Sequence, residues 1–556
     1  MSYTYTKANW SGSQAVFVIE FEFGGSLRRY CSISSQNTIT ISDGANDILI
    51  PFGIEGLDLT ESINAGESIE ENIVSIQLAT SLPLMELWSR GITLEGVSAS
   101  VYLFLEKLGS ISQTWSEKVK IYEGIIEEPV FGDPQLQEGI VSFGIELQAW
   151  DASKFLLPSN YIDTRWPDRA DSADGKIYPV VIGNPGYRVV NEIGRQVDFP
   201  AFPAYCNIIF AGPGTDASFV ISAGIVESSG LRIYDQNSKS HADVVLTGSD
   251  SYGRAYSSTD IPIGGGSIAL PGDDVNGVSQ AWWCHFTDSA GGIASPYQAG
   301  SLTLAGDVLR WALSKTGQRI DEGAFANLSN FLNRYKLAGY INNSAISGYD
   351  WLAGNLLPLL PISLRTGALG IKPVLNVLNA ITQVEPICSI SLGDNLECNQ
   401  VSPVQAIRAT SDIINDFTLI WGKNGMTQEY TQISRCRAIA VDPQDIVSEY
   451  SIISTGRYGI KPQSYESDYI YDRATANLIA KDMIRARSLV LHQIEVEMPV
   501  YYGYLQIGDV LSVTSSFLYL TDHKMMITAK TWRDAQTNWV YILQFELNPI
   551  QNYRSK

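Results

Sequence analysis

The sequence predicts a multidomain, mainly β protein with a smaller α+β part in the middle of the chain. Its 556 residues exceed the size at which one hydrophobic core stops growing, so about three to five domains are expected. Short segments rich in β-branched and aromatic residues recur toward both ends, with turn residues between them. Hydrophobic residues make up 45% of the chain and charged residues only 17%, which supplies large cores and leaves few charges for a solvated surface.

The first segment, residues 1–152, is expected to be a β-barrel-like domain. Its strand patterns are short and regularly spaced, which favours a barrel or a sandwich. One helix is predicted at 82–91, where Gly91 can end it. The sequence DGAND at 43–47 lacks the periodic oxygen ligands of a calcium loop, so we interpret it as a hairpin turn. The predicted strands cover 15–23, 37–52, 71–79, 98–106, 118–128 and 139–151.

The second segment, residues 153–300, is expected to contain a linker strand and a loop-rich β insertion. KIYPVVIGNPGY at 176–187 predicts a strand that stops at Asn-Pro-Gly. From there to residue 300 the chain is rich in Gly, Ser and Asp, with scattered short strands. This composition is typical of a surface insertion with many turns.

The third segment, residues 301–380, is predicted to be a small α+β domain. The pattern at 301–320 places four apolar residues on one helix face, and Gly317 is the expected stop. Further helices are predicted at 323–336 and 349–360, and a short hairpin at 367–375. The four apolar residues are Leu304, Val308, Ala312 and Leu313.

Two further segments complete the chain: a β segment at 381–450, with a strand at 417–424, and a second β-barrel-like domain at 451–556. A helix is predicted at 472–487, with the basic residues Arg485 and Arg487 at its C-terminal end, where the helix dipole favours them. Alternating apolar residues follow, which predicts a strand with one buried face. The helix face comprises Ala476, Ile479, Ala480 and Met483, and the strand face comprises Ile494, Val496, Met498 and Val500.

The chain is acidic, with 59 Asp and Glu against 38 Lys and Arg and a net charge of −21. This balance excludes a basic surface that binds nucleic acid. An acidic wall would repel the phosphate backbone, which suits a conduit through which DNA slides without binding. The alternative is that the acidic residues only confer solubility.

The six cysteines are scattered and form no C-x-x-C pair, which predicts neither a zinc site nor a dense disulfide framework. Reduced, mostly buried thiols are expected, as in proteins that fold in a cytoplasm. MSYTYTKANW, the first ten residues, lacks the features of a signal peptide, and the apolar stretch at 356–364 is too short to span a bilayer. No membrane insertion is therefore expected. The cysteines are Cys31, Cys206, Cys284, Cys388, Cys398 and Cys436.

Catalytic motifs are absent from the sequence: it contains no G-x-S-x-G, no H-E-x-x-H and no P-loop. Gly212-Pro213-Gly214 is interpreted as a turn, because it lacks a lysine that could hold a phosphate. None of the four histidines has a second metal ligand at helical spacing. The sequence thus predicts no catalytic, cofactor-binding or metal-binding residues and no enzyme activity. The histidines are His241, His285, His492 and His523.

Two pairs of adjacent residues could form parts of a carbohydrate site. Asp273-Asp274 lie on a predicted loop, where a turn is the simpler interpretation, although catalytic acids can also lie far apart in a sequence. Trp282-Trp283 could stack on sugar rings, but neighbouring residues of a strand face opposite ways, so one of the two indoles is expected in a core.

The segment LQIGDVLSVTS at 505–515 raises the same question for Asp509. A carboxylate at the end of a strand could act on a substrate. Gly508-Asp509 also suits a tight turn or bulge between strands, and no Cys or His partner lies near in the sequence. We therefore interpret Asp509 as a turn residue.

The order of these segments resembles the tail-tip or baseplate hub proteins of long-tailed phages and gene transfer agents. The similarity rests on the Arg- and Ala-rich helix at 473–487, on HQIEVEMPVYYGYLQIGDVLSV with its glycine turns, and on the closing WVYILQFEL. KIYPVVIGNPG and WSRGITLEGVSASVYLFLE resemble further parts of these proteins. The resemblance covers roughly 1–185 and 301–556, and residues 186–300 match no family.

The resemblance implies a structural virion protein at the tail tip, made in the host cytoplasm. Two similar β-barrels in each chain would let a homotrimer build a ring of six barrels on a sixfold tail tube. The implied partners are the distal tail protein or tail tube, the tape-measure protein, and a fibre or spike, with DNA passing without specific binding and a possible contact with the host envelope. The alternatives are a carbohydrate-binding or carbohydrate-degrading virion protein, or a receptor adhesin, that acts through 186–300.

Overall fold

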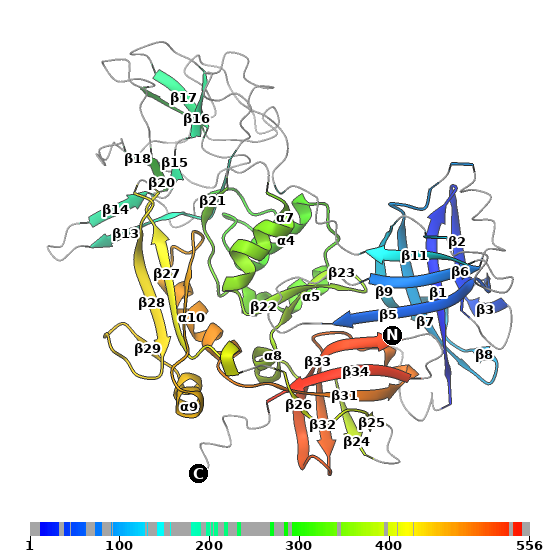
Figure 1. Cartoon of the computed structure of the whole chain (residues 1–556). Helices are drawn as coiled ribbons and strands as arrows, with labels where there is room; N and C mark the ends of the chain where they lie inside the picture. The colour runs from blue at the N-terminus through cyan, green and yellow to red at the C-terminus, as the bar shows by residue number, and fades with distance from the viewer. Residues whose placement is uncertain are drawn as a thin grey trace.

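A computed structural model describes the fold over most of the chain. The described residues are 12–32, 38–62 without 45, 73–79, 90–127 without 92, 130–131, 142–148, 156, 179–190, eight short strands or parts of strands from Gly186 to Phe286, 292–341, 346–393, 398–532 without 408, 409 and 426, and 538–546. Strands dominate and form several separate sheets, with helices concentrated in the middle of the chain (Figure 1). The predicted class, a mainly β multidomain protein with an α+β middle, is confirmed.

The N-terminal strands form a curved sheet in the order β2-β1-β7-β9-β11-β6-β5 (Figure 1). Alternate residues of its strands point into a core of aliphatic and aromatic side chains, as a sheet with one buried face requires. DGAND forms the turn of the hairpin β3–β4, as predicted. The bounds are β1 Gln14–Phe23, β2 Ser26–Cys31, β3 Thr38–Ser42, β4 Asp47–Pro51, β5 Ile54–Ser62, β6 Ile73–Ala79, β7 Ser98–Lys107, β8 Ser110–Ile111, η1 Trp115–Glu117, β9 Val119–Ile126, β10 Val130–Phe131 and β11 Ser142–Gln148.

The C-terminal sheet is built from two stretches of the chain that lie far apart in sequence. Its strands follow the order β24-β32-β33-β34-β31, and β25 and β26 pair with β31. Ile494, Val496 and Met498 are fully buried on one face of β31, as the alternating pattern predicts. The bounds are β24 Cys388–Leu392, β25 Asn399–Gln400, β26 Gln405–Ala406, β31 His492–Pro499, η6 Val500–Tyr504, β32 Val510–Ser515, β33 Leu520–Trp532 and β34 Asn538–Phe545.

The two sheets are joined edge to edge by β5 and β33. The first part of β33 pairs with β32, and its last four residues, beyond the reach of β32, pair antiparallel with β5, from Ala529 opposite Ser62 to Trp532 opposite Leu59. The two β-barrel-like parts expected from the sequence are therefore joined, because the exposed edge of one sheet pairs with the exposed edge of the other. Together the two form one 16-stranded sheet, which does not close into a barrel among the described strands.

Each half of this sheet nevertheless curls until its outer strands meet. An isolated bridge between Cys31 and Phe52 brings the end of β2 to the residues just before β5. In the C-terminal half, a bridge between Leu392 and Cys398 joins the end of β24 to the residue before β25. The two halves thus share the same type of near-closure, although neither is a closed barrel.

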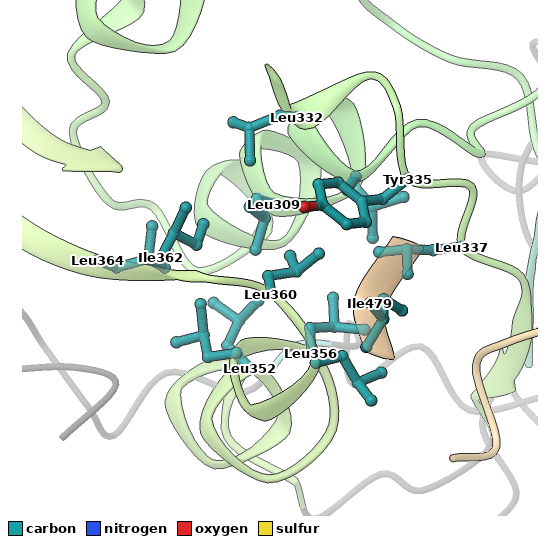
Figure 2. Close-up of a cluster of buried hydrophobic side chains, with 14 of the residues drawn as sticks. Leu309, Leu332, Tyr335, Leu337, Leu352, Leu356, Leu360, Ile362, Leu364 and Ile479 are labelled. Atoms are coloured by element: carbon teal, nitrogen blue, oxygen red, sulfur yellow. The ribbon is translucent and has the colours of Figure 1, made fainter. Parts of the chain in front are cut away.

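The middle of the chain forms a helical block around the hairpin β22–β23. Its core, shown in Figure 2, packs Leu309 of α4 against Leu352, Leu356 and Ile362, together with Ile479 of helix α10. Full burial of such an aliphatic side chain contributes about 1.5–3 kcal/mol. The bounds are α4 Ala305–Lys315, α5 Glu322–Asn327, α6 Ser329–Leu332, β21 Gly339–Ile341, α7 Gly348–Trp351, η3 Leu352–Leu356, η4 Leu357–Leu359, β22 Ile362–Gly367, β23 Gly370–Leu375 and α8 Val377–Gln383.

A four-stranded sheet with helices α9 and α10 lies on the side of the middle block that faces away from the N-terminal sheet (Figure 1). Asp472 caps α10 by accepting a hydrogen bond from the backbone N–H of Thr475, and Ala476, Ile479 and Ala480 are fully buried. Asp482 and Ile484 share the buried face in place of the predicted Met483, which is only half-buried. The bounds are η5 Thr410–Asp412, β27 Asp416–Lys423, β28 Tyr430–Arg437, β29 Ile446–Val447, α9 Glu449–Tyr458, β30 Pro462–Glu466 and α10 Arg473–Arg487.

The segment predicted as a linker strand and insertion enters the fold through β12, which pairs with β21 of the middle block. The insertion itself contains short strands in small sheets of two or three, at the end of the molecule away from the C-terminal sheet (Figure 1). The bounds are β12 Val180–Ile182, β13 Gly186–Val190, β14 Gln196–Pro200, β15 Phe202–Pro203, β16 Tyr205–Ile209, β17 Asp216–Val220, β18 Leu231–Tyr234, β19 Ser267–Pro271 and β20 Trp283–Phe286.

Several predicted elements differ from the structure. The helix expected at 323–336 is two short helices, α5 and α6, and the hairpin expected at 367–375 begins earlier, since its first strand is β22. The helix expected at 82–91 lies almost wholly outside the described residues. The five-segment division of the chain stays a prediction.

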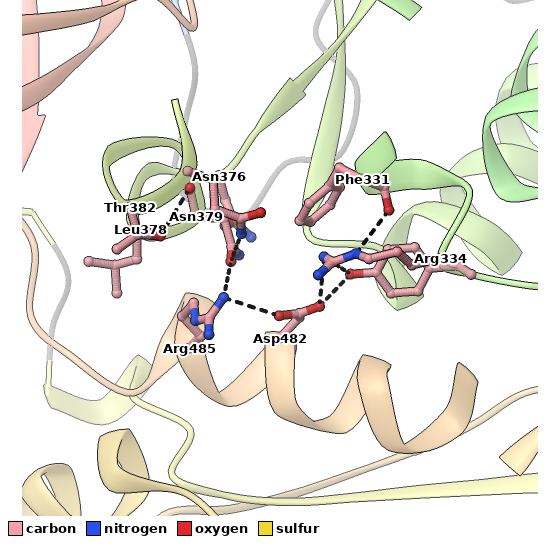
Figure 3. Close-up of polar contacts among 10 residues, drawn as sticks. Phe331, Arg334, Asn376, Leu378, Asn379, Thr382, Asp482 and Arg485 are labelled. Atoms are coloured by element: carbon pink, nitrogen blue, oxygen red, sulfur yellow. Dashed lines mark hydrogen bonds and ion pairs between the residues drawn. The ribbon is translucent and has the colours of Figure 1, made fainter. Parts of the chain in front are cut away.

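A buried carboxylate ties α10 to the middle block, as Figure 3 shows. Asp482 Oδ2 accepts a hydrogen bond from the Tyr335 hydroxyl at 2.5 Å, and the guanidinium groups of Arg334 and Arg485 lie 3.5 and 3.6 Å from its oxygens. Arg485 also donates to Asn379 of α8. The charge on Asp482 is thus balanced from two elements, which is the condition under which a buried carboxylate is tolerated.

Candidate functional site at the junction of the two sheets

The best-defined polar site in the described residues lies where the two sheets and the middle block meet. We call this site the junction: it comprises Glu61 of β5, Lys372 of β23, Lys530 of β33 and the segment 500–509. The segment includes the 3-10 helix η6 and the turn that precedes β32. All three parts of the fold therefore contribute charged groups to one small region.

Side chains of the C-terminal sheet satisfy the carbonyl groups of the segment 500–509. Lys530 Nζ donates to Gly503 O at 2.6 Å and to Leu505 O at 3.0 Å. Trp539 Nε1 donates to Val500 O at 3.2 Å, and the Tyr541 hydroxyl donates to Tyr502 O at 2.9 Å. These bonds fix an irregular backbone segment that has few partners of its own.

Aromatic side chains pack the two sheets together beside η6. The Phe17 ring of β1 lies 5.0 Å from that of Trp532, and Trp532 lies 5.0 Å from Trp539, measured between ring centroids. The ammonium group of Lys530 stands 4.4 Å from the Trp539 ring centroid, a cation–π contact. The edge-on contact between Phe17 and Trp532 therefore joins residues from both ends of the chain.

Gly503 allows η6 to approach both sheets closely. A Cβ atom at this position would lie 2.8 Å from Trp539 Nε1 and still closer to a methyl group of Leu103 on β7. Trp539 is fully buried and cannot move away without disturbing its neighbours. The position is therefore restricted to glycine by packing.

Burial changes the ionisation of all four charged groups. It raises the pKa of Glu61, against the opposing effect of Lys530 and Lys372, and it likewise raises the pKa of Asp509. It lowers the pKa of Lys372, and it lowers the pKa of Lys530 to about 8. The junction therefore holds two acids and two bases in surroundings that disfavour charge.

Further contacts tie the middle block to the junction. Lys372 Nζ donates to Gln506 Oε1 at 2.7 Å, and the guanidinium group of Arg365 donates to Ser62 O at the end of β5 at 2.8 Å. Arg319 forms an ion pair with Glu123 of β9. The block thus contacts both halves of the large sheet at the place where they join.

Asp509 is the turn residue that the sequence predicts. Its Oδ2 accepts a hydrogen bond from the backbone N–H of Gln506 at 2.7 Å. Gly508 has a φ of 92°, and a Cβ atom there would lie 2.6 Å from a methyl group of Val374 on β23. The Gly-Asp turn therefore both reverses the chain and packs on the middle block.

The histidines and cysteines of the described residues lie in buried or half-buried surroundings and form no metal site. The described residues contain no cluster of His, Cys, Asp and Glu that could hold a metal ion. Burial lowers the pKa values of His492 and His523, whose rings pack against the Phe545 ring. Cys31 and Cys436 are buried thiols, as predicted. No helix within the described residues is long and apolar enough to cross a bilayer.

The carbohydrate alternative rests on side chains outside the described residues. Of the two tryptophans, Trp283 begins strand β20, and nothing further is described of either side chain. The structure likewise does not describe the side chains of the other candidates of this region, which are His241, His285, Asp273, Asp274, Cys206, Cys284 and the turn at 212–214. The sugar site and the adhesin therefore stay predictions.

The sequence analysis missed the charged residues of the junction. Lys530 offers a signal, because Ile527 and Trp532 share its strand face across a bulge in β33, and both are buried. A lysine on such a face needs a buried partner. Glu61 offers a weaker signal, because its strand, IEGLDLTES, has three acidic residues and lacks the apolar pattern of a buried strand.

Substitution of Gly503 by Ala is expected to lower stability, because the new methyl group overlaps Trp539 and Leu103. Overpacking of this kind costs about 1–3 kcal/mol, which differential scanning calorimetry can detect as a lower Tm. The matched control is Gly456→Ala in α9, where no atom lies within 4 Å of the new Cβ and helix propensity favours alanine. An unchanged Tm for G503A would show that η6 is not pressed between the sheets.

The buried Lys530 predicts a specific pH dependence. Its pKa is about 8 in the folded chain and about 10.4 when unfolded. Between these values the unfolded chain binds more protons, so this residue makes stability rise with pH. The groups that face it are Glu61, Asp509 and Lys372. The Tm of the wild type should therefore rise relative to that of Lys530→Met as the pH increases above about 8.

The control for this pH series is Lys481→Met, which removes an exposed lysine. Its Tm should run parallel to that of the wild type over the same pH range. Parallel curves for wild type and K530M would contradict a lowered pKa for Lys530.

No protein-family model matches this chain, and no curated protein matches it either. Among solved structures it is similar to the 43 kDa tail protein of prophage MuSo2 from Shewanella oneidensis, with 9% identity, a TM-score of 0.37 and coverage of 95% of this chain and 97% of that one. It is also similar to a tail protein from Neisseria meningitidis MC58, with 10% identity, a TM-score of 0.35 and coverage of 95% and 97%. A chain of the virion of a native gene transfer agent particle has 11% identity, a TM-score of 0.36 and coverage of 67% and 85%. These three solved structures are thus two tail proteins and one chain of a virion.

Proposed function

We propose that this chain is a structural protein of a phage tail tip, a hub that forms a trimeric ring at the end of the tail tube. The observation that carries the proposal is the edge-to-edge pairing of β5 with β33, which makes two curled sheets into one rigid unit. Three such units would place six curled sheets around an axis. That arrangement suits a sixfold tube above and threefold symmetry below.

The surface composition supports a place in an assembly. Only 17% of the residues are charged, and large apolar side chains are exposed at several places in the described residues, including Leu108, Phe517 and Tyr519. Phe517 and Tyr519 lie in the turn between β32 and β33, and Leu108 lies between β7 and β8. Where such apolar groups gather into one patch, they are typical of surfaces that other proteins cover.

The partners follow from the same role. The ring would bind the distal tail protein or the tail tube on one side, hold the end of the tape-measure protein, and carry a fibre or spike. Its net charge of −21 would repel DNA, so that DNA passes during ejection without specific binding. Contact with the host envelope would come from the partners or from the 186–300 insertion. The proposed role requires no catalytic residue and no cofactor.

The full-length chain should form a threefold ring with a central opening. Sedimentation velocity measures its mass in solution, and class averages of negatively stained particles show its rotational symmetry. A chain that stays monomeric at every concentration, with no ring in the averages, contradicts the proposal.

Gly503→Ala sharpens this test, because the ring requires a fixed angle between the two sheets. We expect fewer rings from G503A than from the wild type at the same concentration, and as many rings from the control G456A. Equal ring formation by all three proteins would mean that the junction does not set the geometry of the ring.

A further inference from the structure

A small cavity lies inside the junction. Its volume is about 10 Å³, which has room for one water molecule. Side chains from all three parts of the fold line it: Glu61 from β5, Thr366 and Lys372 from the hairpin β22–β23, and Lys530 from β33. The site is thus built from segments more than 460 residues apart in the sequence.

Two buried oxygen atoms in the cavity lining have no hydrogen-bond partner in the protein. They are Oε1 of Glu61 and Oγ1 of Thr366, on side chains that are 6% and 3% exposed. Buried polar atoms of native proteins are almost always paired, with protein groups or with ordered water. Both oxygens therefore call for a partner that can reach them from within the cavity.

Two of the three lysines that line the cavity, Lys372 and Lys530, have donors to spare. An ammonium group carries three N–H donors. Lys530 donates to two carbonyl oxygens and Lys372 to Gln506 Oε1, so at least one donor of each is left for the cavity. A metal cation would be repelled by these ammonium groups, and a phosphate or carboxylate ion is too large for the volume.

We propose that the cavity is a binding site for one water molecule. The water donates hydrogen bonds to Glu61 Oε1 and Thr366 Oγ1 and accepts hydrogen bonds from Lys372 and Lys530. All four hydrogen-bonding positions of the water are then used, and both of the unpaired oxygen atoms gain a partner. The proposal does not depend on the proposed function, since it concerns only how the three parts are held together.

The substitution Thr366→Val tests this site by the sign of its effect. If the water is bound, valine removes one of its partners and the Tm should fall by about 1 to 2 °C. If the cavity is dry, valine removes an unpaired buried hydroxyl and the Tm should rise or stay the same. The reference variant is Thr528→Val on β33, which makes the same change at a buried hydroxyl that donates to Ile542 O. It measures how far the Tm falls when a paired buried hydroxyl is lost.

A crystal or cryo-EM structure of the full chain, at a resolution that shows ordered water, gives the second readout. The proposal expects one density peak within hydrogen-bond distance of Glu61 Oε1 and Thr366 Oγ1, together with a fall in Tm for T366V. It is overturned by a cavity without density, by an ammonium group in direct contact with Glu61, or by a rise or no change in the Tm of T366V. Ring formation does not enter this test, so its failure leaves the proposed function to its own experiment.

Discussion

The fold depends on the four-residue ladder between the end of β33 and the end of β5. Without it the two curled sheets would keep exposed edges and would be held together only by the middle block and by the packing around η6. With it, a hydrophobic core that includes Phe17, Trp532 and Trp539 runs from one sheet into the other. The buried Lys530 lies within this ladder, opposite Glu61, and its hydrogen bonds hold the irregular segment 500–509 in place. Strand pairing, aromatic packing and buried charge thus act at one location.

Buried charges at this location fix the arrangement of the three parts more than they stabilise the fold. Desolvation of Glu61, Lys372 and Lys530 costs free energy that their mutual attraction offsets only in part, and well-packed apolar residues would be as stable or more stable. A polar junction instead accepts one arrangement of its three parts, because any other arrangement leaves a charge unpaired. We regard this as the reason that charged groups stand where the three parts of this fold meet.

Much of the local structure could be predicted from the sequence. The alternation around Val496 and the apolar face around Ile479 identified β31 and α10, because each element buries one face with the period of its own geometry. Strand β5 escaped prediction, since Glu55, Asp58 and Glu61 interrupt its apolar residues. The joining of the sheets could not be predicted at all. Glu61 and Lys530 are 469 positions apart by their numbers, and no local pattern relates them.

Native-state hydrogen exchange measures the central claim most directly. If the two sheets are one unit, the amides of residues 59–62 and 529–532 should be protected as strongly as those in the middle of β1 and β31, because they open only when the large sheet opens. Rapid exchange of these amides, at rates typical of exposed loops while β1 and β31 stay protected, would mean that the two sheets are separate bodies and that the ladder between them does not hold in solution.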